Sequence, residues 1–122
     1  MTTKIVCEIP GRPVPCPRPR VSRKGTYYPK RYTDWLSGAK ALLRDACVRQ
    51  NKGKLIEGHL SMTMYFTGAA ANVDTDNLIK ACLDAGQGQV YENDRQVKHV
   101  EAWNKDGDPL TQIVVRVLEG SE

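Results

Sequence analysis

Four charged residues close together in the sequence could do chemistry. Asp74, Asp76 and Asp94 are carboxylates, and Lys80 follows Asp76 by four residues. Mg²⁺ prefers oxygen ligands and usually keeps several waters, so two or three carboxylates plus a substrate phosphate complete its shell. Without a cation, carboxylates held this close would repel one another. The pattern therefore predicts a Mg²⁺ site with Asp74, Asp76 and Asp94 as ligands and a lysine beside them.

The role of Lys80 depends on its partner. On a helix it would share a face with Asp76, so it could form a surface salt bridge with that aspartate. It could instead contact a scissile phosphate and stabilise the charge that develops during cleavage. Asp84 follows Lys80 at the same spacing, and we expect it to pair with Lys80 or to be exposed. Asp74 or Asp76 could also be a helix N-cap, but a cap accounts for only one of three aspartates.

The positive charge of the chain is concentrated in one segment. The formal net charge is +4, yet residues 11–33 contain no Asp or Glu. Five prolines between residues 10 and 19 remove backbone donors and fix φ, so we expect a stiff, extended loop at 10–32. Its cations suit contact with nucleic acid phosphates. With Lys80, the expected DNA-binding residues are Arg18, Arg20, Arg23, Lys24, Lys30 and Arg31.

Three tyrosines lie among these cations. Tyr27, Tyr28 and Tyr32 could stack on exposed bases, but we favour packing against the domain.

The residue patterns predict one α+β domain over residues 1–122. Apolar residues alternate at 4–9 and within 55–67, which indicates strands. Two further strands are predicted at 95–103 and 110–118, on either side of the turn signal at 106–109, as an antiparallel pair. Helical spacing covers 33–50, with Thr33 as N-cap, and a second helix runs from 74–77 to 85, followed by Gly86. The order β-α-β-α-β-β predicts a mixed β-sheet with two helices packed on one face.

The cysteines, the histidines and the apolar runs argue against three other kinds of protein, namely zinc proteins, hydrolases with a Ser–His–Asp triad and membrane proteins. The four cysteines form no CxxC pair, so we expect reduced, packed thiols rather than a zinc site. Both histidines lie on strand patterns, and we expect neither to serve a Ser–His–Asp triad. No apolar run is long enough to span a membrane and no signal peptide is evident, which predicts a cytoplasmic protein.

The spaced motif resembles the signature of the RusA family of Holliday-junction resolvases, found in bacteria and their prophages. It consists of Asp74-Thr-Asp76-Asn77-Leu78-Ile-Lys80, Asp84-Ala85, Val90-Tyr91 and Asn93-Asp94-Arg-Gln96-Val97. The resemblance implies a homodimer that binds four-way junction DNA and uses Mg²⁺ to make paired, symmetric nicks in recombination and repair. It implies that Asp74, Asp76 and Asp94 are the catalytic carboxylates and Lys80 the active-site lysine. The family often has a second aspartate where this chain has Asn93, a departure that would weaken any metal contact from that position.

Two other functions stay open at this point. A non-catalytic protein that binds DNA, or one that binds a protein partner, would keep the basic segment but have no need for three converging aspartates. A Mg²⁺ nuclease acting on flaps or replication forks would share the same site and differ only in substrate.

Overall fold

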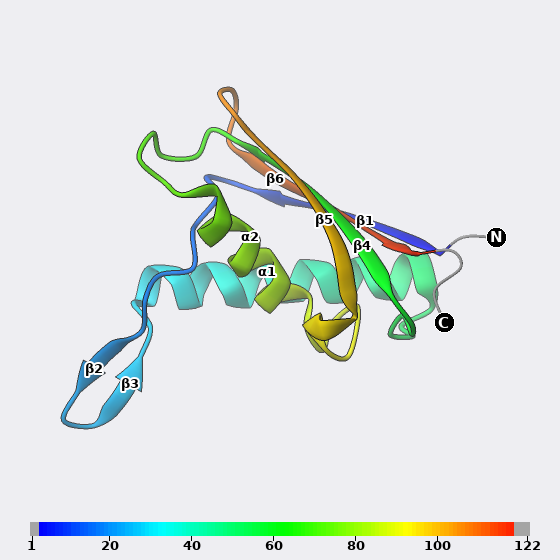
Figure 1. Ribbon diagram of the computed structural model, residues 1–122, viewed down its shortest axis with the longest axis horizontal. Helices are drawn as coiled ribbons and strands as arrows, with labels where there is room; N and C mark the ends of the chain where they lie inside the picture. Colours follow the sequence, from blue (N-terminus) through cyan, green and yellow to red (C-terminus); the bar gives the residue numbers. More distant parts are fainter. Residues whose placement is uncertain (1–2, 119–122) are drawn as a thin grey trace.

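The computed structural model describes residues 3–118. Its main sheet has four strands in the order β1-β6-β4-β5, namely β1 (Lys4–Pro10), β6 (Leu110–Val117), β4 (Leu60–Thr67) and β5 (Val97–Lys105). The helices α1 (Lys30–Asn51) and α2 (Thr75–Gly86) lie on one face of this sheet (Figure 1). The predicted α+β class, with a mixed sheet and both helices on one face, is confirmed.

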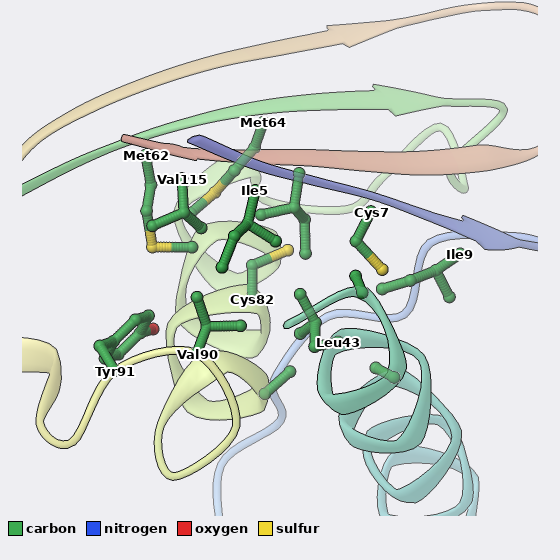
Figure 2. Packing of buried hydrophobic residues seen from close by; sticks show 14 of the residues in the cluster. Ile5, Cys7, Ile9, Leu43, Met62, Met64, Cys82, Val90, Tyr91 and Val115 are labelled. Atoms are coloured by element: carbon green, nitrogen blue, oxygen red, sulfur yellow. The ribbon is translucent and has the colours of Figure 1, made fainter. Parts of the chain in front are cut away.

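The core lies between the sheet and the two helices. Alternation along β4 buries Leu60, Met62, Met64 and Phe66, because successive strand residues point to opposite faces. Side chains of β1 and β6 extend the same apolar surface, and Leu43 of α1 and Cys82 of α2 meet it from the other side (Figure 2). All four cysteines, Cys7, Cys16, Cys47 and Cys82, are free and buried, as predicted.

The prediction that the last two strands form an antiparallel pair is wrong. β4 lies between β5 and β6 and pairs with β5 in parallel and with β6 antiparallel. β4 and β6 carry the buried alternation and occupy the centre, whereas most of β5 is exposed, as suits an edge strand. The turn at 106–109 therefore passes the end of β4, where Gly68 N–H donates to Lys105 O at 3.0 Å.

The basic segment is only partly the extended loop that its prolines predict. Residues 12–19 have no regular structure, but β2 (Arg20–Ser22) and β3 (Gly25–Tyr27) form an antiparallel hairpin. Its two-residue turn is Arg23-Lys24, and the hairpin projects away from the rest of the molecule (Figure 1).

The first helix also begins earlier than predicted. α1 starts at Lys30, after Pro29 with φ −56°, a backbone angle that suits the approach to a helix. Thr33 is therefore not its N-cap, and its hydroxyl donates to Lys30 O at 3.1 Å within the first turn. Within residues 3–118, neither helix is both long and apolar enough to cross a membrane.

Candidate active site

The first turn of α2 carries two of the predicted carboxylates. Asp74 is the N-cap residue with φ −80° and ψ 129°, and Asp76 follows in the first turn. The Asp74 side chain makes no capping hydrogen bond, so helix capping does not account for this carboxylate. Asn104 of β5 donates to Thr75 Oγ1 at 3.2 Å, which ties the start of α2 to the edge of the sheet. Both aspartates are exposed.

Lys80 pairs with Asp84 and not with Asp76. Its Nζ donates to Asp84 Oδ1 at 3.1 Å. This hydrogen bond is the main reason why the pKa of Lys80 is raised above its ordinary value, and the negative charge of Asp94 raises the pKa further. Lys80 is therefore an ammonium at neutral pH, with two acidic residues in its neighbourhood.

Asp84 has two further partners from distant parts of the chain. Its Oδ2 accepts a hydrogen bond from Tyr32 OH at 3.1 Å and a weaker one from Cys16 Sγ at 3.8 Å. Burial is the largest cause that raises the pKa of Tyr32, with Cys16 and Asp84 adding to it, so its hydroxyl stays protonated and able to donate. The expected pairing of Asp84 with Lys80 is confirmed, but the sequence contained no spacing that indicated the other two contacts.

Asp94 lies in an element that the sequence predictions missed. The 3₁₀ helix η1 (Asp94–Gln96) precedes β5, where a strand from residue 95 was expected. Asn93 caps it by accepting the Arg95 N–H at 2.9 Å, and the Gln96 side chain accepts the Asn93 N–H at 3.0 Å. Gln87, just after α2, accepts the Asp94 N–H at 3.2 Å. The backbone around Asp94 is thus held beside the end of α2.

The carboxylates present fit part of a Mg²⁺ shell. Among residues 3–118, no three His, Cys, Asp or Glu side chains gather closely enough to hold a metal ion. Asp74 and Asp76 nevertheless offer exposed carboxylates two residues apart, and Mg²⁺ is usually held by one or two carboxylates plus water and substrate phosphates. Their oxygen chemistry suits the ion, and the participation of Asp94 stays a prediction.

The basic side chains are spread over the hairpin and its flanks. Arg18, Arg23, Lys24 and Arg31 are exposed. Lys30 is exposed too, but its Nζ bonds Asp34 Oδ2 at 2.6 Å, so part of its charge is balanced locally.

The three tyrosines of this segment differ in exposure. Tyr32 is packed, as expected, with only 2% of its surface exposed, whereas Tyr27 and Tyr28 are 48% and 38% exposed. The expectation of packed tyrosines is therefore correct only for Tyr32.

One histidine contacts a serine and a carboxylate on the exposed face of the sheet. Ser61 Oγ lies 2.9 Å from His99 Nδ1, and His99 Nε2 lies 3.5 Å from Glu101 Oε1. Strand alternation places these side chains on the sheet face opposite the helices, whereas Lys80 belongs to a helix on the covered face. We interpret them as an exposed cross-strand contact.

Comparison with known proteins bears on this site. The family model described as Endodeoxyribonuclease RusA matches residues 10–118, a range that includes every site residue described above. No curated protein matches the chain.

Proposed function

Because the chain belongs to the RusA family of endodeoxyribonucleases, we propose that it resolves Holliday junctions by paired, symmetric nicks. It would bind the four-way junction as a homodimer and act in the cytoplasm in recombination and repair of bacterial or prophage DNA. The observation that carries the proposal is a contact between its two charged regions. Cys16 N–H, from the basic segment, donates to Asn77 O at 2.9 Å, one residue beyond Asp76. The predicted DNA-binding segment thus adjoins the carboxylates.

Asp74 and Asp76 would hold Mg²⁺, with Asp94 as the predicted third ligand. Nucleases of the family generally depend on a divalent metal. When bound, the ion would polarise the scissile phosphate and lower the pKa of an attacking water.

Lys80 would supply positive charge to the same phosphate. Its side chain is 55% exposed, so the ammonium can be reached from solvent. A donor aimed at the charge that develops in the transition state accelerates cleavage more than it strengthens ground-state binding. The hairpin cations would position the DNA backbone without reading its sequence, and a symmetric dimer would place two such sites on one junction.

The test compares substrates and metal. The purified protein is incubated with a labelled four-way junction, a linear duplex and a flap, each with Mg²⁺ or EDTA, and products are resolved on a denaturing gel. We expect paired nicks confined to the junction that require Mg²⁺. Metal-dependent cutting of the flap would assign another substrate to the same site, and binding without cutting would make the protein a non-catalytic DNA-binding protein.

A further inference from the structure

We propose that Asp84 is a positioning residue that holds the Lys80 ammonium in place for the phosphate, and that Tyr32 and Cys16 in turn fix Asp84. This inference rests on the proposed nuclease function. It is based on the two carboxylate oxygens of Asp84, which accept hydrogen bonds from different partners. Oδ1 accepts from Lys80 Nζ at 3.1 Å, and Oδ2 accepts from Tyr32 OH at 3.1 Å and Cys16 Sγ at 3.8 Å.

The two donors to Oδ2 belong to a packed part of the molecule. Tyr32 is 2% exposed and Cys16 is 8% exposed, and they form a small apolar cluster with Ala81 of α2. They come from α1 and from the basic segment, so three separate parts of the chain meet at Asp84. A carboxylate fixed through one oxygen presents its other oxygen in a defined direction.

The fixed position of Oδ1 matters because a lysine ammonium without a bonding partner has no defined position. The long side chain of lysine has many rotamers, and on the exposed side of a helix it would sample many positions. Bonding Asp84 engages one of its three N–H donors and leaves the others for a phosphate. A displacement of about 1 Å at a catalytic group can cost roughly 100-fold in rate.

A second pair in the same molecule provides a matched control. Arg49 bonds Asp45 at 2.8 Å with the same four-residue spacing on α1, but the two side chains are 62% and 60% exposed. The side chain of Asp84, by comparison, is only 27% exposed. Asp45→Asn removes the same charge from an exposed pair outside the proposed site, so any effect of net charge on DNA binding appears in both variants.

The experiment is a double-mutant cycle measured by single-turnover nicking of a four-way junction with saturating protein and Mg²⁺. The variants are Asp84→Asn, Lys80→Met, the double variant and Asp45→Asn. We expect Asp84→Asn to slow nicking about 10- to 100-fold with junction affinity retained. In the Lys80→Met background the same change should slow nicking no more than about twofold, because the group it positions is gone. Asp45→Asn should nick at the wild-type rate.

Tyr32→Phe keeps the inference testable if Asp84→Asn unfolds. It removes only the hydroxyl donor, so we expect a loss of several-fold that again disappears in the Lys80→Met background. An effect of equal size in both backgrounds would overturn the inference, since it would show action through the fold or the metal and not through Lys80.

The cycle also separates this inference from the proposed function. Slow nicking by Lys80→Met together with wild-type nicking by both Asp84→Asn and Tyr32→Phe overturns the positioning role alone. Wild-type nicking by Lys80→Met, or no nicking by the unmodified protein, overturns the assignment of the active site itself.

Discussion

Gly86 lies against the ring of Tyr91 so closely that a Cβ atom at Gly86 would be 2.6 Å from the ring and from its hydroxyl oxygen. Gly86 is the last residue of α2 and is buried, whereas the sequence suggested a glycine just beyond the helix end. The Tyr91 ring is fully buried, and its OH donates to Leu83 O at 2.7 Å. The missing side chain thus makes room for the residue that anchors the end of α2.

Gly86→Ala should therefore destabilise the protein by about 1–3 kcal/mol, because overpacking outweighs the gain in helix propensity. The measurement is chemical denaturation. Gly38→Ala is the matched control, since Gly38 is also helical and a Cβ there meets nothing within 4 Å. It should stabilise the protein by about 0.5–1 kcal/mol. Equal effects at both positions would contradict the packing role of Gly86.

Asp76→Asn should abolish nicking while junction binding stays intact or becomes tighter. The substitution removes a metal ligand and also a carboxylate that would repel the DNA phosphates. Because Asp76 is exposed, the free energy of unfolding should change by no more than about 1 kcal/mol, through the helix dipole. Gel-shift and nicking assays measure the two activities. Loss of the helical circular dichroism signal would show instead that this aspartate supports the fold.

Replacing Arg23 and Lys24 together by alanine should weaken junction binding and flatten its salt dependence. Each lost phosphate contact lowers the slope of log K against log salt by about 0.9, so the double variant should lower it by up to about 1.8. The control variant, Lys4→Ala with Arg116→Ala, also removes two positive charges. These residues lie opposite each other on β1 and β6, on the exposed face of the sheet. An equal change in slope from this control would remove the hairpin from the DNA interface.

Asn93→Ala should destabilise the protein by about 1 kcal/mol through loss of a cap. The Asn93 side-chain oxygen accepts both the backbone N–H of Arg95 at 2.9 Å and its Nε–H at 3.2 Å. Asn93→Asp keeps an acceptor at this position and should retain wild-type stability in urea titrations. If the aspartate variant is as unstable as the alanine variant, the side chain contributes something other than the cap.

Local patterns account for the elements that the sequence predicted correctly. Alternation at 60–67 and helical spacing at 33–50 and 77–85 reflect which side chains are buried, so they indicated β4 and both helices. The order of strands depends on pairing between distant segments, which no local pattern records. For that reason β5 and β6, neighbours in sequence, appeared to be a hairpin although β4 separates them.

In the candidate site too, the sequence indicated the local contacts but not those between distant segments. The spacing of Asp76, Lys80 and Asp84 indicated a shared helix face, and the i, i+4 partner of Lys80 proved to be Asp84. The contacts of Asp84 with Cys16 and Tyr32 span 68 and 52 residues. They arise only once α1 and the basic segment pack against α2, so the sequence alone could not reveal them.

The place of β6 in the sheet has a consequence for synthesis of the chain. β1 is paired with β6 alone, in a register that joins Lys4 to Arg116. During translation, β1 therefore cannot pair with β6 until nearly all of the described residues have been synthesised. Its unpaired edge and its apolar side chains Ile5 and Ile9 stay available to chaperones, or to other nascent chains, for that whole interval.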